Sequence, residues 1–153
     1  ILFGYEKGAF TGAYKSSAGK FEVAQGSTLL LDEVSEMSLG LQAKLLRVLQ
    51  EKKVERLGGN KEINLDVRVL ATSNRDLGSY VADGKFREDL FYRLDVVSIM
   101  LPTLQDRIQD IPLLVATFIQ QFNKREERQV KSVSPEVLQL LFQHPWQGNI
   151  RET

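Results

Sequence analysis

Three largely apolar runs in the first hundred residues predict strands of a parallel sheet. The runs lie at residues 28–31, 67–72 and 96–101. Runs of this kind are typical of strands that are buried on both faces, as parallel strands usually are. Pro102, which has no backbone N–H to donate, ends the third run. We therefore expect a parallel sheet that contains these three strands.

Segments with a helical pattern separate these runs. Residues 19–24 and 86–94 predict short helices, and Ser38 can cap a longer one. The apolar positions of this longer helix recur every three or four residues and are Leu41, Leu45, Val48 and Leu49. Residues 54–57 predict a short extended piece before the glycine pair at 58–59. Strands that alternate with helices indicate an α/β layered fold.

Beyond residue 102 the sequence shows helical patterns only. Asp110 and Ser134 can each cap a helix, and a proline follows each of them in the first turn. The apolar faces of the two helices consist of Ile111, Leu114, Val115, Phe118, Ile119 and Phe122, and of Val137, Leu138, Leu141 and Phe142. This change of pattern predicts a partial α/β domain at 1–102 and a helical subdomain at 103–153.

Composition and charge describe an ordinary globular chain. Of the 153 residues, 42% are hydrophobic and 26% are charged, and 20 basic residues balance 20 acidic ones. Zero net charge provides no global attraction to nucleic acid or to a membrane surface. The lack of cysteine excludes disulfides and thiolate metal sites, and the single histidine, His144, cannot form a histidine metal cluster. No apolar run approaches the ~20 residues of a membrane span, and no signal peptide opens the chain, so we expect a cytoplasmic protein.

Near the N-terminus, six small or apolar residues predict an exposed loop tip. They are Gly8, Ala9, Phe10, Thr11, Gly12 and Ala13. Glycine permits tight or left-handed backbone, and no long side chain anchors the segment. Phe10 is anomalous there, because burying a phenylalanine is worth about 1.5–3 kcal/mol. Either Phe10 folds back onto the core of its own chain, or the loop presents it to a partner.

Polar side chains follow the first two predicted strands. Asp32 and Glu33 come directly after the first strand, where carboxylates can hold Mg²⁺ and polarise an attacking water. Acidic residues at a strand end also commonly do no more than solvate a turn. Asn74 follows the second strand, and its amide could orient a water or contact a γ-phosphate, or it could form an Asx-turn without function. The acidic pair and Asn74 therefore each have one catalytic and one structural interpretation.

Two arginines occupy the predicted helix at residues 86–94. Arg87 and Arg93 are six positions apart, so on one helix they would point about 120° apart and could not perform the same task. One could reach a neighbouring subunit while the other braces the interface. In the alternative, Arg93 forms a local ion pair with Asp89, worth only ~0.2–0.5 kcal/mol.

Taken together, these segments resemble the sigma-54-dependent transcriptional activators of bacteria, a branch of the AAA+ ATPases. The resemblance is most specific at residues 2–13, where Leu-Phe-Gly-Tyr-Glu-Lys precedes the six residues of the loop. It continues through the acidic pair, residues 71–75 and 86–94, and Trp-Gln-Gly-Asn-Ile-Arg-Glu at 146–152. It implies the parallel sheet of a P-loop NTPase of the AAA+ type, followed by a small all-helical subdomain.

The resemblance also implies roles for the acidic pair and the loops. Residues 8–13 would contact sigma-54, the RNA polymerase factor, and residues 58–65 would form a second insertion that moves with the first. Asp32 would hold Mg²⁺ and bind nucleotide, as in a Walker B motif. Glu33 would be the catalytic carboxylate that polarises water.

Four further roles follow from the same resemblance. Asn74 would be a catalytic sensor I residue. Arg87 and Arg93 would supply arginine fingers across a subunit interface, and the sequence does not decide which of them is the finger. Arg151 would be the sensor II residue that binds nucleotide phosphates. His144 and Trp146 are interpreted as packing residues.

The sequence departs from the family pattern at several positions. Gln147 stands where the family usually has proline, and Thr153 where it has leucine. Residues 102–107 also differ from the usual version, which is rich in proline and arginine. These differences bear on how the helical subdomain docks and leave the family resemblance intact.

No Gly-x-x-x-x-Gly-Lys-Ser/Thr pattern occurs, so the Walker A loop that cradles phosphates is absent from these residues. We therefore expect a stretch from the later part of an AAA+ domain, truncated in the sensor II helix and inactive by itself. The implied parent binds ATP and Mg²⁺, forms a hexameric or heptameric ring, and remodels sigma-54 RNA polymerase for open-complex formation. It would contact DNA only through a domain outside this chain. The alternative is a non-catalytic module that binds sigma-54 or a sister subunit without turnover.

Overall fold

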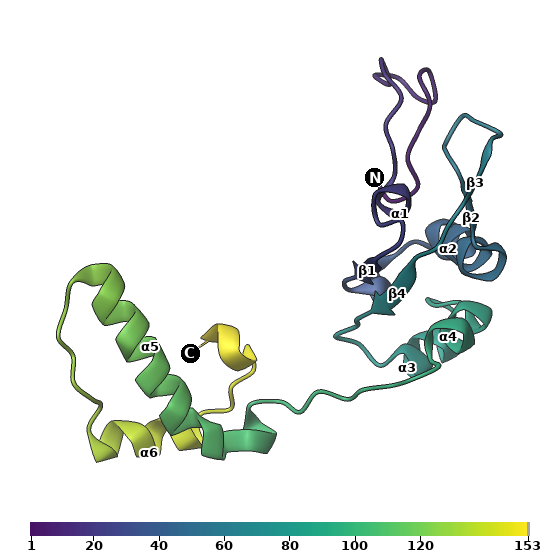
Figure 1. Cartoon of the computed structure of the whole chain (residues 1–153). Coiled ribbons are helices and arrows are strands. Elements are labelled where there is room, and N and C mark those ends of the chain that lie inside the picture. The colour runs from purple at the N-terminus through teal and green to yellow at the C-terminus, as the bar shows by residue number, and fades with distance from the viewer. Residues whose placement is uncertain (153) are drawn as a thin grey trace. The chain divides into compact units, whose positions relative to one another are not determined.

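The computed structural model describes residues 1–152, so the difference from the family at Thr153 lies outside the described residues. These residues divide into a first compact unit, Ile1–Ser98, and a second that begins at Ile99 (Figure 1). None of the helices within 1–152 has the length and apolar character required to cross a membrane.

The frame of the first unit is a two-stranded parallel sheet. It consists of β1 (Thr28–Leu31) and β4 (Arg68–Ala71), with Leu29 paired to Val69 and Leu31 paired to Ala71. Both strands lie where their apolar runs predicted them, and their parallel orientation is confirmed.

Two features of the predicted sheet are wrong. Residues 96–101 form no strand, and the apolar side chains there are at least 79% exposed. A run rich in Val and Ile becomes a strand only beside a backbone that takes its hydrogen bonds, and none within 1–152 does so. The sheet is also not buried on both faces, because Leu30 and Leu70 are 57% and 46% exposed. The core of this unit covers only the face that carries Leu29 and Leu31.

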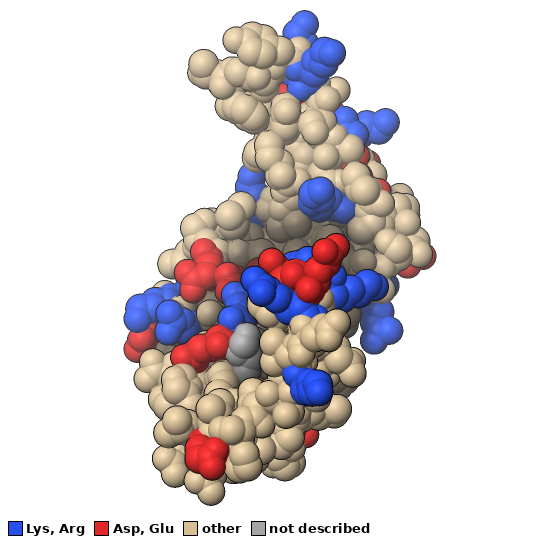
Figure 2. Space-filling model, turned by 90° about the vertical axis from the view of Figure 1, so that its left-hand side faces the viewer, with Lys and Arg blue, Asp and Glu red and all other residues tan. Residues whose placement is uncertain are grey.

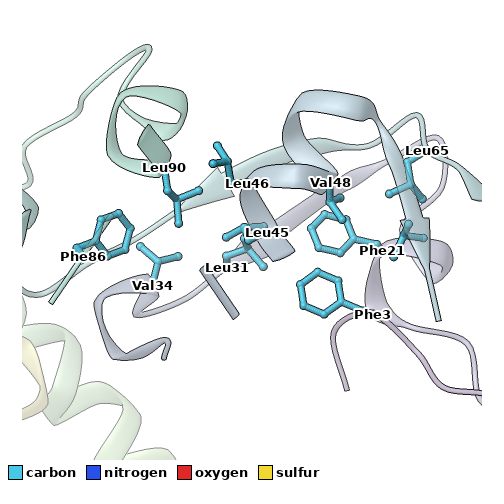
Figure 3. Close-up of a cluster of buried hydrophobic side chains, with 11 residues drawn as sticks. Phe3, Phe21, Leu31, Val34, Leu45, Leu46, Val48, Leu65, Phe86 and Leu90 are labelled. Carbon is cyan, nitrogen blue, oxygen red and sulfur yellow. The ribbon is translucent and has the colours of Figure 1, made fainter. Parts of the chain in front are cut away.

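Four helices accompany the sheet: α1 (Lys20–Val23), α2 (Leu39–Glu51), α3 (Leu77–Ala82) and α4 (Glu88–Leu94). Their apolar side chains meet those of the sheet in one cluster, drawn in Figure 3. Its buried members are Phe3, Phe21, Leu31, Val34, Leu45, Leu46, Val48, Val54, Leu65, Phe86 and Leu90. This cluster joins the N-terminal segment to the chain around α4.

Helix α2 differs from its prediction at one position. Leu45 and Val48 are buried as expected, but Leu41 is 44% exposed and Gln42 is fully buried in its place. Ser38 precedes the first helical residue, although its hydroxyl makes no capping hydrogen bond.

An antiparallel hairpin follows α2. Strands β2 (Lys53–Glu55) and β3 (Glu62–Asn64) pair with Val54 opposite Ile63. The hairpin and the N-terminal loop both extend away from β1 and β4, at the opposite end of the unit from α3 and α4 (Figure 1).

The second unit is helical, as predicted. It contains α5 (Ile111–Glu126) and α6 (Pro135–Gln143), with 3₁₀ turns at Gln105–Asp110 and Asn149–Glu152. The Ser134 hydroxyl caps α6 by accepting a hydrogen bond from Val137 N at 3.4 Å. Asp110 precedes α5 without a capping bond from its side chain.

Leu104, Ile111 and Trp146 form the buried core of the second unit. Trp146 is buried and its Nε1 donates to Leu141 O at 2.8 Å, so it is a packing residue as predicted. The His144 ring lies edge-on against the indole, but its side chain is exposed. Asn149 Oδ1 accepts from Leu104 N at 2.8 Å and so ties the C-terminal turn to this core.

Three side chains predicted to face inward in this unit are instead exposed. They are Phe122, Val137 and Phe142. Two helices and two short turns are too few to enclose both apolar faces, and Phe122 lines an open apolar groove.

Candidate functional site

The acidic pair lies at the edge where β1 and β4 both end. Because the strands are parallel and Leu31 pairs with Ala71, the next residues, Asp32 and Thr72, are neighbours. The Thr72 hydroxyl donates to Asp32 Oδ1 at 2.5 Å and accepts from Glu33 N at 3.2 Å. Parallel pairing thus places a carboxylate, a hydroxyl and a second acidic residue at one sheet edge.

Glu33 has an unusual backbone conformation. Its φ of 53° and ψ of 52° lie in the left-handed region, which few residues other than glycine adopt. The following residue, Val34, is completely buried, and its N–H donates to Thr72 O at 2.9 Å. The Glu33 side chain itself is exposed and has no hydrogen bond or ion pair within residues 1–152. The turn therefore leaves this carboxylate facing solvent next to Asp32.

Asn74 belongs to the segment that follows β4, two residues beyond Thr72. Its side chain is exposed and makes no hydrogen bond to the described part of the chain. The adjacent turn is made by Ser73, whose hydroxyl accepts from Arg75 N at 3.0 Å and donates to Arg75 O at 2.8 Å. The interpretation of Asn74 as an Asx-turn residue is therefore wrong, and its amide is available to a ligand.

These donors fit Mg²⁺ only as part of a larger ligand set. Within residues 1–152 no group of three or more His, Cys, Asp or Glu side chains could hold a metal. Asp32 nevertheless presents carboxylate oxygen, which Mg²⁺ prefers, and this ion commonly takes one or two carboxylates with phosphate oxygens and waters. The remaining ligands would have to come from a bound phosphate and from water.

The two candidate arginines have different surroundings. Arg87 precedes α4 with an extended backbone, so it does not share a helix with Arg93, and the 120° argument does not apply. Its guanidinium makes a bidentate pair with Asp89, at 3.0 and 2.6 Å. The hydrogen bond raises the pKa of Arg87 and lowers the pKa of Asp89. Arg93 Nη2 instead donates to Leu49 O at 3.1 Å, so the predicted pairing of Arg93 with Asp89 is wrong.

Gln42, for which the sequence pattern predicted no role, positions Arg87. Its Oε1 accepts from Arg87 N at 2.9 Å, and its Nε2 donates to Met37 O at 2.8 Å and to Lys85 O at 3.1 Å. The amide thereby joins α2 to the turn that leads into α4. One signal was present in the sequence, because Gln42 is a polar residue at a position of the apolar stripe, three before Leu45.

The loop at residues 8–13 is held on a short antiparallel stem. Tyr5 N donates to Ser17 O at 2.9 Å, and Ser17 N donates to Tyr5 O at 2.8 Å. At the tip, Gly8 and Gly12 have φ values of 84° and 100°, in the left-handed region that favours glycine. The prediction of a loop tip that depends on glycine is confirmed.

Phe10 is exposed at this tip. Its relative exposure is 47%, and its ring lies 5.0 Å from the ring of Tyr5, on the loop stem. It does not belong to the core of the first unit, so the interpretation in which it folds back onto that core is wrong. Thr11 is also exposed, whereas Ala13 is 5% exposed and anchors the end of the loop.

An ion-pair cluster connects the loop stem, α1 and the hairpin. Arg56 Nε and Nη2 donate to the two carboxylate oxygens of Glu22, at 2.9 and 2.7 Å, and Nη1 donates to Glu6 Oε1 at 3.2 Å. Hydrogen bonding from Arg56 lowers the pKa of Glu22, and Glu22 in turn raises the pKa of Arg56. One guanidinium thus holds two segments that lie 34 and 50 positions away in sequence.

The hairpin tip also contacts the loop directly. Glu6 N donates to Leu57 O at 2.9 Å, and Leu57 N donates to Gly4 O at 3.1 Å. A Cβ on Gly58 would lie 2.8 Å from Ala9 Cβ, which is closer than side chains approach. Residues 58–65, the predicted second insertion, therefore begin in contact with the loop that carries Phe10.

The family model described as the sigma-54 interaction domain matches residues 1–100. The chain belongs to this family. A second model, described as the AAA+ ATPase lid domain, matches residues 105–152. The resemblance identified from the sequence motifs is confirmed.

Curated relatives of this sigma-54 interaction domain chain are bacterial regulatory proteins. The response regulator protein FleR of Pseudomonas aeruginosa is 54% identical over 151 residues, which cover 99% of this chain and 32% of FleR. The regulatory protein AtoC of Escherichia coli is 53% identical over 151 residues, which cover 99% of this chain and 33% of AtoC. The chain thus spans about a third of the length of these relatives.

Solved structures confirm the fold class. A crystal structure of NtrX from Brucella abortus matches with a TM-score of 0.89 and 38% identity, over 99% of this chain and 34% of NtrX. A crystal structure of NtrX in complex with ATP matches with a TM-score of 0.88 and 38% identity, over 99% of this chain and 32% of that one. The predicted α/β fold of the P-loop AAA+ type, followed by a helical part, is therefore correct.

Arg151 lies in the part of the chain that matches the lid domain. It belongs to the 3₁₀ turn Asn149–Glu152, and its guanidinium makes no hydrogen bond or ion pair within the described residues. Figure 2 shows both basic and acidic side chains at the surface, and the sequence has 20 of each.

Proposed function

We propose that this chain is part of the ATPase module of a sigma-54-dependent transcriptional activator. The whole protein would couple ATP hydrolysis to remodelling of sigma-54 RNA polymerase during open-complex formation. The proposal rests on the residues that follow the two parallel strands in a chain of this family. Asp32 and Glu33 follow β1, and Asn74, whose side chain makes no hydrogen bond within residues 1–152, follows β4.

Each residue at this edge has a role that its surroundings support. Asp32 would ligate Mg²⁺, which when bound neutralises charge on the transferred phosphoryl group. Glu33, whose carboxylate faces solvent, would orient and polarise the attacking water. Asn74 would donate its amide to that water or to the γ-phosphate. Both carboxylates and the amide are exposed in this chain and are therefore reachable by a nucleotide.

The arginines would complete the site across subunits. Arg87 and Arg93 both lie on or beside α4, and an arginine finger supplied by a neighbouring subunit can be worth ~10³–10⁵ in rate. Arg151 would contact nucleotide phosphates from the lid. These assignments require a ring in which ATP lies between protomers, of six or seven subunits by family resemblance.

The loop at residues 8–13 would contact sigma-54. Support comes from the match to the sigma-54 interaction domain and from the exposure of Phe10 on a stem that the hairpin braces. The Phe10 ring packs beside Tyr5 and remains 47% exposed, which leaves apolar surface that a partner could cover.

Calorimetric titration with ATP and Mg²⁺ tests the nucleotide site. The 153-residue chain should give a flat titration, because phosphate affinity in this architecture comes mainly from backbone N–H groups and a lysine of a Walker A loop. An extended chain, with an upstream strand, Walker A loop and helix added, should bind ATP. In the extended chain Glu33→Ala should retain binding and stop turnover.

The results separate this proposal from its rival. ATP binding by the 153-residue chain itself would contradict the account of the site. Sigma-54 binding by an extended chain that never hydrolyses ATP would favour a non-catalytic binding module.

A further inference from the structure

The side chain of Thr72 contacts both members of the acidic pair. Thr72 is the first residue after β4 and lies beside the chain that leaves β1. Its hydroxyl has a single hydrogen to donate, and that hydrogen goes to Asp32 Oδ1. The oxygen of the Thr72 hydroxyl accepts a hydrogen bond from the N–H of Glu33. One hydroxyl thus bonds to the side chain of the first acid and to the backbone of the second.

The backbone of Thr72 reinforces these bonds. Thr72 N donates to Leu31 O at 2.9 Å, and Thr72 O accepts from Val34 N at 2.9 Å. Thr72 therefore bonds to four successive residues, from the last residue of β1 to the buried Val34. The neighbouring hydroxyl, on Ser73, is engaged in its own turn with Arg75, so within residues 1–152 no other hydroxyl is bonded to the pair.

From these contacts we propose that Thr72 is a positioning residue for the magnesium ligand and the catalytic carboxylate. The inference rests on the proposed function of Asp32 and Glu33. The bond from the hydroxyl to Oδ1 restrains the orientation of the Asp32 carboxylate, which would ligate Mg²⁺. The hydroxyl carries no charge, so Asp32 keeps its full negative charge for a cation, which a lysine or arginine partner would partly neutralise.

The contact to Glu33 fixes the second acid by a different route. The left-handed backbone of Glu33 turns the chain sharply between Asp32 and the buried Val34. Bonds from the N–H groups of Glu33 and Val34 to Thr72 hold this turn in place. Without them the turn would sample other conformations, and the backbone of Glu33 would no longer be held next to Asp32.

Three substitutions test this inference. Thr72→Val keeps the shape and removes the hydroxyl, whereas Thr72→Ser keeps the hydroxyl. Thr117→Val, in α5, is the matched control, because its hydroxyl bonds only to Leu113 O of its own helix. The first measurement is amide hydrogen exchange at Glu33 in the 153-residue chain without nucleotide. Thr72→Val should accelerate exchange about five- to tenfold, as expected for one lost hydrogen bond, and the other two should not.

The second measurement is the Mg²⁺ dependence of ATP hydrolysis by the extended chain. Thr72→Val should lower kcat and raise the Mg²⁺ concentration for half-maximal rate, with little change in the apparent KM for ATP. Thr72→Ser should restore both quantities. A residue that acted only on folding would not move the Mg²⁺ dependence and would not be rescued in this way.

Failure of this inference is distinguishable from failure of the proposed function. If Thr72→Val leaves Glu33 exchange unchanged, or changes exchange but neither kcat nor the Mg²⁺ dependence, Thr72 is not a positioning residue. If the unsubstituted extended chain binds ATP and Mg²⁺ but hydrolyses nothing, the proposed function is refuted, and this inference with it.

Discussion

The buried amide of Gln42 provides the sharpest prediction for the first unit. Replacing Gln42 by alanine removes three hydrogen bonds, to Met37 O, Lys85 O and Arg87 N. Two of these bonds join Gln42 to residues 43 and 45 positions away in sequence. The amide therefore makes tertiary hydrogen bonds between α2 and the segment that precedes α4.

The expected cost follows from these bonds. Each intramolecular hydrogen bond contributes about 0.5–1.5 kcal/mol net, so three contribute roughly 1.5–4.5 kcal/mol. The void left at a fully buried site increases the cost, while water that reaches the partly exposed turn at Lys85 and Arg87 reduces it. We expect Gln42→Ala to lower the free energy of unfolding of the first unit by about 2–4 kcal/mol.

Urea unfolding of the 153-residue chain measures this effect. With an m-value of about 1–3 kcal/mol/M, the ellipticity midpoint of the first unit should fall by about 1 M or more. Trp146 is the only tryptophan and lies in the second unit, so its fluorescence provides an internal reference transition. Gln50→Ala is the matched control, because Gln50 is an exposed glutamine on the same helix. It should change stability by less than about 0.5 kcal/mol.

A direct readout complements the midpoint. The Arg87 amide loses its acceptor in Gln42→Ala and should exchange its hydrogen faster. Equal unfolding midpoints for Gln42→Ala and Gln50→Ala, or an unchanged exchange rate of the Arg87 amide hydrogen, would show that the Gln42 amide does not stabilise the contact between α2 and the segment before α4.

Three further predictions concern the loop, the ion-pair cluster and the arginines. Phe10→Ala in the whole protein should spare ATPase activity but abolish sigma-54 binding and open-complex formation. Tyr14→Ala is the control, because Tyr14 is also an exposed aromatic residue. Loss of folding in Phe10→Ala would argue against an effector loop. The pKa of Glu22 is lowered from its ordinary 4.5, so its stabilising effect is fully present above that value and is lost as the pH falls through the lowered pKa. Acid unfolding in urea should accordingly be steeper for the unsubstituted chain than for Glu22→Gln, and identical pH profiles would contradict the ion-pair assignment. Mixing subunits that carry Arg87→Ala with subunits that carry Glu33→Ala should restore some hydrolysis, because mixed rings contain intact interfaces; absence of rescue in confirmed rings would indicate a local role for Arg87.

Local sequence patterns were sufficient for several elements of this chain. The apolar runs at 28–31 and 67–72 predicted the two strands of the parallel sheet, because short apolar segments flanked by turns favour strands. Gly8 and Gly12 predicted the loop tip, because left-handed backbone is inexpensive only for glycine. The acidic pair after β1 was likewise visible as a pattern, and so was the cap that Ser134 provides for α6.

Only the tertiary structure decided which polar groups meet. Thr72 reaches Asp32 across 40 positions in sequence, and Arg56 reaches Glu6 across 50, so no periodicity of the chain could indicate either contact. The run at 96–101 shows the converse. Its residues favour a strand, but a strand needs hydrogen bonds from a neighbouring backbone, and within residues 1–152 none provides them. Propensity and periodicity are local properties of a sequence, whereas register, ion pairs and buried amides depend on which distant segments the fold brings together.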